Sequence, residues 1–141
     1  MHPTPLNGDS LYFAYGENLN RAHMALWCPD AVSISRATLA DHRLVFRPWT
    51  DIVPSPGDRV LGALYEIGPR DLAAIDEYEE VPVLYQRIHV TVQTDSGPIR
   101  TIAYQMTPGH PPTMPPEDYL NLILQGYQDW ELDTSALTVI V

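Results

Sequence analysis

Basic residues are scarce in this sequence. Lysine and arginine together number 8, against 18 aspartates and glutamates, so the formal net charge is −10. Phosphate backbones and anionic membrane surfaces are bound through clustered lysine and arginine. This scarcity argues against nucleic acid and against a membrane surface as partners.

Cysteine and long apolar runs are also nearly missing. The single cysteine, Cys28, rules out an internal disulfide and fits a reducing compartment. No apolar run approaches the roughly 20 residues that a membrane-spanning helix needs. The opening MHPTPLNGDS lacks the basic and apolar regions of a secretory signal. We therefore expect a soluble, cytoplasmic protein.

The motifs of common catalytic and metal sites are absent as well. The five histidines are scattered without metal-ligand spacing, and neither GxSxG nor GxxxxGK[ST] occurs. We expect no metal ion and no cofactor, and we interpret Cys28 as a buried core residue.

The sequence is rich in proline and long enough to form a hydrophobic core. It has 141 residues, 45% of them hydrophobic, and 14 prolines. Prolines fix turns and loops. This length predicts one domain spanning residues 1–141.

Strands and helices are expected in mixed order. Alternating or aromatic-rich runs predict strands over 10–15, 35–47, 59–67, 84–94, 99–106 and 136–141. Helical spacing predicts helices over 18–30, 68–79 and 117–130. The proline-bearing segments 49–58 and 107–116 are interpreted as loops. Without regular βαβ alternation, this indicates an α+β fold with a small, mixed, mostly antiparallel sheet or barrel and flanking helices.

The segment AIDEYEEVP (74–82) places four carboxylates within five positions. With about 100° per residue and Leu72 at zero, Ile75 lies at about −60°, Glu79 at about −20° and Glu77 at about 140°. Glu79 is thus expected to face the core and Glu77 to face water. Burial raises the pKa of a carboxyl group and suits it to proton transfer near neutral pH. Spacing alone does not separate this role from a Glu79 that extends to solvent at the helix end.

A second conspicuous stretch is LYFAYGENLN (11–20). An aromatic strand stops at Gly16, and a polar turn comes at once after it. Either the turn only reverses the chain, or its backbone holds a ligand.

Three segments then occur in the order typical of one family. They are YFAYGENL (12–19), PSPGDRVLGALYEI (54–67) and IDEYEEVPVLYQRIHVTV (75–92), with a later AYQMT…PP…YLNLILQG. In these segments the sequence resembles the γ-glutamylcyclotransferase family and its AIG2-like relatives, over about residues 11–127. The resemblance implies a small mixed barrel with flanking helices. It also implies a cofactor-independent enzyme that cyclises a γ-glutamyl amide or peptide to 5-oxoproline and releases an amine or amino acid.

The resemblance also assigns site residues. The family's catalytic glutamate matches Glu79, which the helical projection selects independently. Two substrate-site tyrosines match Tyr85 and Tyr119, although a core role for Tyr119 stays open. The family's glycine turn, YGSNL, falls on Tyr15, Gly16, Glu17, Asn18 and Leu19. Free amides in such a turn form an anion site for a carboxylate or an oxyanion, and a glycine lets the backbone approach closely.

Two positions depart from the family pattern. Glu17 occupies the place that is usually serine, where a second carboxylate would be repelled by an anion. Either its side chain points outward, or it contacts a cationic part of the substrate. The second alternative favours γ-glutamylated amines, polyamine-like or aminoglycoside-like, over glutathione. Glu80 and Pro82 stand where the family tends to have glycine, so the helix exit is expected to differ in shape.

The residues leave three functional interpretations. The first is a γ-glutamylcyclotransferase with a small-molecule γ-glutamyl substrate. The second is a non-catalytic small-molecule binding or regulatory module on the same fold. The third is a related enzyme that cleaves a γ-glutamyl bond in biosynthesis or amine catabolism. The sequence leaves open whether the protein forms a homodimer.

Overall fold

Five strands close into a barrel. The computed structural model describes residues 10–137. Its strands are β1 (Leu11–Ala14), β2 (Val32–Phe46), β3 (Thr50–Glu66), β4 (Tyr85–Thr94) and β5 (Gly97–Met106). Around the barrel they lie in the order β1-β3-β2-β4-β5, and a parallel contact between β1 and β5 closes it. The other pairs are antiparallel, so the predicted mixed, mostly antiparallel barrel is confirmed.

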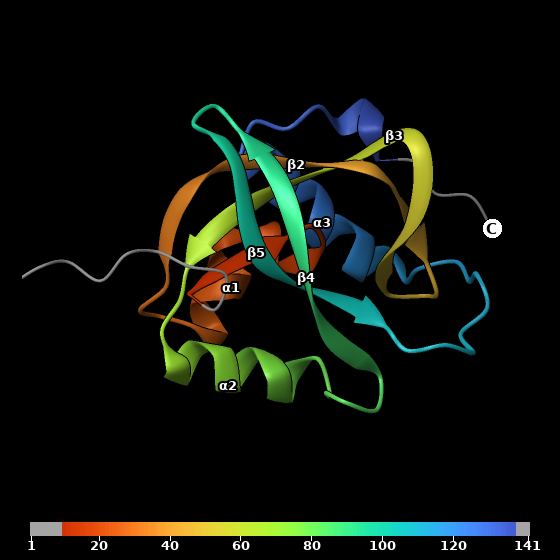
Figure 1. Ribbon diagram of the computed structural model, residues 1–141. Helices are drawn as coiled ribbons and strands as arrows, with labels where there is room; N and C mark the ends of the chain where they lie inside the picture. The colour runs from red at the N-terminus through yellow and green to blue at the C-terminus, as the bar shows by residue number, and fades with distance from the viewer. Residues whose placement is uncertain (1–9, 138–141) are drawn as a thin grey trace, which may run out of the picture.

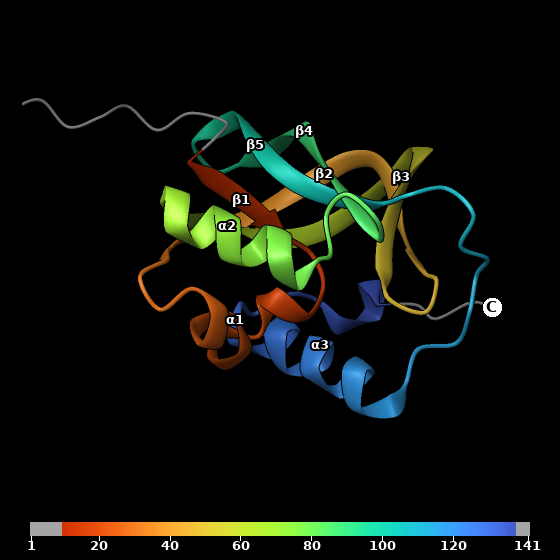
Figure 2. The same cartoon turned by 90° about the horizontal axis from the view of Figure 1, so that it is seen from below.

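The helices cover one side of this barrel. They are α1 (Arg21–Trp27), α2 (Pro69–Tyr78) and α3 (Glu117–Asp129), with short 3-10 turns η1 (Glu17–Leu19) and η2 (Thr134–Ala136). Figure 1 shows β4 and β5 crossing the front, with α2 below the barrel and α3 behind it. Figure 2 shows α1 and α3 side by side, with the turn after β1 next to them. None of the helices within residues 10–137 is long and apolar enough to cross a membrane.

Strand β1 is buried on both faces. Phe13 belongs to the cluster inside the barrel, whereas Tyr12 and Ala14 belong to the cluster between the barrel and the helices. A strand in this position is apolar at successive residues rather than at alternate ones. This explains the uninterrupted LYFAY run and leads the chain directly from the core into the turn at Gly16.

All of the segment 49–58 except Trp49 belongs to β3, which corrects the predicted loop. From Thr50 to Pro54 it pairs with the end of β2, in register from Phe46↔Thr50 to His42↔Pro54. Proline lacks an amide donor but is tolerated at a strand edge or beside an irregularity. The register shifts between Ala40 and His42, close to the prolines.

Two further differences concern helix and strand limits. The helix predicted over 18–30 begins only at Arg21, because Asn20 caps it with a side chain that accepts from the His23 N–H. Of the strand predicted over 136–141, residues 138–141 lie outside the described range, and Thr134–Ala136 forms η2.

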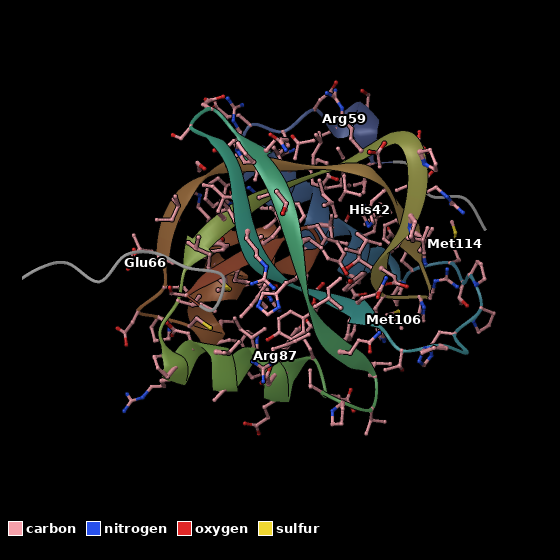
Figure 3. The ribbon with its side chains drawn as sticks, in the orientation of Figure 1. His42, Arg59, Glu66, Arg87, Met106 and Met114 are labelled. Carbon is pink, nitrogen blue, oxygen red and sulfur yellow. The ribbon has the colours of Figure 1, made fainter. Side chains whose placement is uncertain are left out.

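Helix α2 is fixed by a cap at its start and by contacts with the barrel near its end. At its start the Gly68 N–H donates to Oδ2 of Asp71 over 2.9 Å, which caps the first turn. Farther along, Asp76 accepts from the Tyr104 hydroxyl over 2.6 Å and pairs with Arg87 over 3.3 Å. Figure 3 shows Arg87 on the side of β4 that faces α2. These contacts set the position at which the helix ends.

Candidate active site

Glu79 lies at the end of α2 and faces inward. It comes directly after the last helical residue, Tyr78, and its N–H donates to the carbonyl of Ile75 over 2.8 Å. The residue is 8% exposed, whereas Glu77 is exposed to solvent. The orientations that the helical projection predicts for these two glutamates are confirmed.

The surroundings of Glu79 favour its uncharged form. Burial raises the pKa of its carboxyl group well above the ordinary value, and the nearby Glu17 and Glu80 raise it further. The carbonyl groups at a helix C-terminus act in the same direction. No group within residues 10–137 donates a hydrogen bond to this carboxylate. A carboxyl group in such a place is suited to accept and return a proton near neutral pH.

The turn after β1 presents three free backbone amides. The Leu19 N–H donates to the Gly16 carbonyl over 3.1 Å. The Asn20 N–H donates to the Glu17 carbonyl over 3.0 Å. The N–H groups of Gly16, Glu17 and Asn18 have no acceptor in the described part of the chain. Successive free amides of this kind attract a carboxylate or an oxyanion.

Leu19 anchors the turn and does not line the cavity. Its side chain is 0% exposed and packs against Gly126 of α3. Its amide is already used within η1. The structure therefore separates Leu19 from the other four residues of the predicted substrate-binding turn.

Gly16 makes room for a neighbouring hydroxyl group. A Cβ atom at this position would lie 2.3 Å from Oγ1 of Thr50, closer than any real contact. Its φ of −118° is not in the left-handed region, so the constraint that the structure shows at Gly16 is the limited space beside Thr50. The structure thus shows close packing of this glycine against β3, and the close approach of its backbone to a ligand stays a prediction.

Glu17 turns inward, so the outward orientation proposed for it is wrong. The residue is 7% exposed, and its Oε2 accepts a hydrogen bond from the Tyr119 hydroxyl over 2.7 Å. The same hydroxyl accepts from the Thr50 N–H over 3.0 Å. These hydrogen bonds fix the position of the Glu17 carboxylate. The predicted tyrosine of α3 is thereby brought to the site.

Tyr15 and Tyr85 line the site with hydroxyl groups that are already bonded. The Tyr15 hydroxyl donates to the Tyr104 carbonyl, and the Tyr85 hydroxyl donates to the Thr50 carbonyl over 2.6 Å. Burial raises the pKa of both hydroxyls well above the ordinary value. They therefore stay protonated, and they fix the walls of the cavity.

Asn18 uses its side chain to hold the turn in place. Its Nδ2 donates to the Tyr12 hydroxyl over 3.0 Å, and its Oδ1 lies 3.0 Å from Nδ1 of His23. The Tyr65 hydroxyl donates to the Asn18 carbonyl over 3.0 Å. Of this residue, the backbone N–H remains available to a ligand.

The two glutamates share two adjoining cavities. The inner one, of about 10 Å³, is lined by Tyr12, Tyr15, Gly16, Glu17, Asn18, Thr50, Glu79, Tyr85 and Tyr104. The outer one, of about 200 Å³, is lined by Glu17, Trp49, Tyr78, Glu79, Glu80, Leu84, Tyr85 and Tyr119. Both are lined by Glu17, Glu79 and Tyr85. All predicted site residues except Leu19 are therefore brought together.

Sequence reasoning missed several lining residues. Thr50 lies in the segment interpreted as a loop, so nothing marked it. Tyr12 and Tyr104 fit the strand pattern, and a tyrosine in place of an aliphatic residue at a buried strand position was the available signal. Trp49 and Tyr78 complete the outer wall. Within residues 10–137 no three metal-ligating side chains form a cluster that could hold a metal ion.

The comparisons with known proteins agree with one another. The family model described as "Gamma-glutamyl cyclotransferase, AIG2-like" matches residues 12–132. The gamma-glutamylcyclotransferase of Bos taurus is 35% identical over 138 residues, which cover 87% of this chain and 73% of that protein. The Homo sapiens protein of the same name is 30% identical over 84% of this chain and 70% of its own length. A solved gamma-glutamyl cyclotransferase structure has a TM-score of 0.82 and 31% identity, covering 89% of this chain and 82% of its own.

Proposed function

The chain belongs to the AIG2-like gamma-glutamyl cyclotransferase family, and on that premise we propose that it cyclises a γ-glutamyl amide to 5-oxoproline and releases the amine. The observation that carries this proposal is the Glu79 carboxylate. It is 8% exposed, has no hydrogen-bond donor within residues 10–137, and shares a cavity with Gly16 and Asn18.

The reaction needs a base and an acid but no nucleophile from the protein. The α-amino group of the substrate attacks its own γ-carbonyl carbon, and the bond from that carbon to the leaving nitrogen breaks. The ammonium nitrogen loses two protons, one before it attacks and one as it becomes the lactam N–H. The departing nitrogen gains one proton as its bond breaks and a second in water as the free amine becomes an ammonium ion, so no water is consumed. The catalysed transfers are the one from the attacking nitrogen and the one to the departing nitrogen. A single carboxyl group of raised pKa can carry out both transfers. Glu79 is the group assigned to them.

The free backbone amides supply the partial positive charge that attracts an anionic part of the substrate. Among residues 10–137, no lysine, arginine or histidine lines either cavity. An anionic part of the substrate therefore meets no cationic side chain there, and the free backbone N–H groups of Gly16, Glu17 and Asn18 can bind it. They suit the α-carboxylate or the oxyanion that forms on the γ-carbonyl. Holding the amine near the carbonyl in a closed cavity lowers the barrier further.

The test is the Glu79→Gln variant, assayed for 5-oxoproline release from a panel of γ-glutamyl amines and γ-glutamyl amino acids. We expect the wild-type protein to release 5-oxoproline and the variant to lose turnover by about 10²- to 10⁴-fold. Glu77→Gln is the matched control, because Glu77 is on the same helix and exposed. Turnover retained in Glu79→Gln would remove the assignment.

The same experiment separates an enzyme from a binding module on this fold. If the wild-type protein binds γ-glutamyl compounds but releases no 5-oxoproline from any of them, the non-catalytic interpretation holds. Binding is measured by isothermal titration calorimetry with the same panel.

A further inference from the structure

His23 lies behind the walls of both cavities. It is on α1, is half-buried, and is not among the described residues that line either cavity. Its Nδ1 lies 3.0 Å from Oδ1 of Asn18, and its Nε2 lies 3.3 Å from the Tyr78 hydroxyl. Asn18 lines the inner cavity and Tyr78 lines the outer one. One imidazole ring therefore connects the turn after β1 with the last residue of α2.

The hydrogen bonds of Asn18 determine which nitrogen of His23 carries the proton. The Asn18 Nδ2 donates to the Tyr12 hydroxyl over 3.0 Å, so the Asn18 Oδ1 faces His23. An amide oxygen only accepts, and the Nδ1 opposite it must therefore donate. In the neutral ring the other nitrogen, Nε2, then has no proton and can only accept. Among residues 10–137, the donor that reaches it is the Tyr78 hydroxyl.

His23 is expected to be uncharged at neutral pH. Burial lowers its pKa below the ordinary value of 6.5, and the Glu17 carboxylate of η1 raises it by a smaller amount. The acids on the two neighbouring helices bind other groups. Asp71 caps the start of α2, and Asp129 of α3 accepts from the Arg21 N–H. The neutral, Nδ1-protonated ring is therefore the form to consider.

This form of His23 decides what Tyr78 offers to a ligand. Burial and the charges of Glu17 and Glu79 raise the pKa of Tyr78 well above its ordinary value, so the hydroxyl keeps its one hydrogen. When that hydrogen is donated to His23, the Tyr78 oxygen at the outer cavity is left as an acceptor. A γ-glutamyl amide carries an ammonium group and an amide N–H, and both are donors.

Protonation of His23 reverses this arrangement. Its Nε2 then carries a proton and donates to the Tyr78 oxygen. The hydroxyl hydrogen is left to Glu17, which is the second acceptor beside this hydroxyl. The oxygen that a substrate N–H would use is then occupied by the ring.

We propose that His23 is a positioning residue for the substrate: its Nδ1–H holds the Asn18 side chain, and its Nε2 takes the Tyr78 hydrogen, so that the Tyr78 oxygen accepts a hydrogen bond from a substrate N–H group. This rests on the proposed cyclisation. Substrate binding should weaken as His23 becomes protonated, while the proton transfers stay with Glu79.

The protonated nitrogen of His23 tests the arrangement without any substrate. Heteronuclear NMR of the imidazole nitrogens distinguishes a protonated nitrogen from a bare one, and the loss of the signals in His23→Gln assigns them. At a pH well above 6.5 we expect the proton on Nδ1 and none on Nε2. A neutral ring with its proton on Nε2 would overturn the proposal.

Three variants test the contact with Tyr78. Tyr78→Phe removes the hydroxyl, His23→Asn keeps a donor toward Asn18 but lacks Nε2, and His23→Gln keeps an acceptor near the position of Nε2. We expect Tyr78→Phe and His23→Asn each to raise KM for 5-oxoproline release about 2- to 10-fold, the range for one neutral hydrogen bond, and to change kcat less than about twofold. His23→Gln should keep KM within about twofold of the wild-type value.

The double variant of His23→Asn and Tyr78→Phe tests whether the two residues act as a pair. Its KM should equal that of Tyr78→Phe alone, because the interaction between them is already lost. Effects on KM that multiply would show that His23 acts independently of Tyr78, and the proposal would fail. Circular dichroism and thermal unfolding verify that each variant is folded.

The pH dependence of KM gives a readout that a purely structural role would not move. Glutamine does not titrate, so the ratio of the wild-type KM to the His23→Gln KM should rise about 2- to 10-fold as pH falls through the pKa of His23, below 6.5. Glu17 and Glu79 titrate in both proteins. His42→Gln is the matched control, because Figure 3 shows His42 away from α2, and it lines neither cavity. A ratio that does not change with pH would contradict the proposal.

The outcomes separate this inference from the proposed function. If the wild-type protein releases no 5-oxoproline from any γ-glutamyl compound, the cyclisation is at fault, and the substrate role of His23 falls with it. Turnover with an unchanged KM in Tyr78→Phe leaves the cyclisation standing and overturns the role of His23. If the His23 variants fail to fold, the NMR of the wild-type protein and the KM of Tyr78→Phe decide.

Discussion

Three features of its surroundings disfavour the charged form of the Glu79 carboxyl group. It is buried, it neighbours the Glu17 carboxylate, and it comes after the last residue of α2, where the helix presents its carbonyl groups. Groups held in such places are commonly functional, because folding alone gains nothing from them. The consequences can be measured in the unliganded protein.

Glu79→Gln should stabilise the fold at neutral and alkaline pH. The pKa of Glu79 is raised above its ordinary value of 4.5 in the folded protein, so the folded state holds this proton more tightly than the unfolded state. Stability from this group is therefore full below about pH 4.5 and is lost as pH rises through the raised pKa. Glutamine carries no charge at any pH and avoids the loss.

Thermal unfolding measured from pH 4.5 to pH 8 checks this expectation. The Tm of Glu79→Gln should exceed that of the wild-type protein at pH 8, and the difference should shrink toward pH 4.5. Glu77→Gln, on the exposed side of the same helix, should show no such trend. A difference in Tm that is constant across the range would contradict the raised pKa.

The pH dependence of turnover should report the same group. If Glu79 must be ionised to accept a proton, kcat/KM rises with pH around its raised pKa. Glu17 is the largest charged contribution to that pKa and Glu80 the next. Glu17→Gln should therefore move the midpoint to lower pH, and Glu80→Gln should move it less. Normalised pH profiles of the three proteins make the comparison, and identical midpoints would show that Glu79 does not govern the profile.

At the scale of single residues, the sequence predicted the burial of a side chain better than contacts between distant parts of the chain. The burial of Glu79 could be predicted from helical geometry, because an angle fixes the direction of each residue on a helix. Thr50 could not be found this way, because its role depends on three atoms of one residue meeting Tyr85 and Tyr119 from distant parts of the chain. No local pattern encodes such a meeting.

At the scale of the elements, α3 and the turn after β1 lie in close contact. A Cβ atom at Gly126 would lie 2.6 Å from the backbone nitrogen of Asn20 and 2.6 Å from Cβ of Leu19. The backbone of α3 thus rests directly on η1. The helix carries Tyr119 and the turn carries Glu17, so this contact also sets the bond between those two side chains.

Gly126→Ala should destabilise the protein by about 1–3 kcal/mol, the usual cost of overpacking a tight contact. The gain in helix propensity, about 1 kcal/mol, offsets part of this. Because the added methyl group pushes against η1, 5-oxoproline release should fall as well. Urea denaturation and the turnover assay measure the two effects.

Asn121→Ala is the control for that substitution, because Asn121 is on the exposed side of the same helix. It should leave turnover unchanged and alter stability by less than about 0.5 kcal/mol. Full activity and stability in Gly126→Ala would mean that α3 does not set the position of the turn.

The elements themselves were largely predictable, with one instructive failure. Helix α2 and the hairpin of β4 and β5 have regular patterns and clear ends, and both appear where they were predicted. The segment 49–58 was misjudged because its prolines and glycine are typical of a loop. In the structure its first half is paired with β2, and the tertiary partner overrides the local preference.

At the scale of the whole molecule, the formal net charge is −10, and the outer cavity is lined by Glu17, Glu79 and Glu80. A field of one sign speeds the approach of ligands of the opposite sign, and salt screens it over about 10 Å at 0.1 M. The field and the cavity therefore act in the same direction on a cationic substrate.

This predicts a salt effect that depends on the substrate. Raising NaCl from about 20 mM to about 300 mM should lower kcat/KM for γ-glutamyl-1,4-diaminobutane several-fold, because the Debye length shortens over that range. The value for γ-glutamyl-pentylamine should change by less than about twofold. Equal sensitivity of the two substrates to salt would argue against electrostatic attraction of the leaving group.

The bond between Glu17 and Tyr119 joins positions 102 residues apart. During synthesis, the turn and the barrel strands leave the ribosome well before α3 does. A nascent chain can thus pair its strands before α3 supplies Tyr119, which lines the pocket and donates a hydrogen bond to the Glu17 carboxylate. The complete pocket therefore forms last, with the helix that supplies Tyr119.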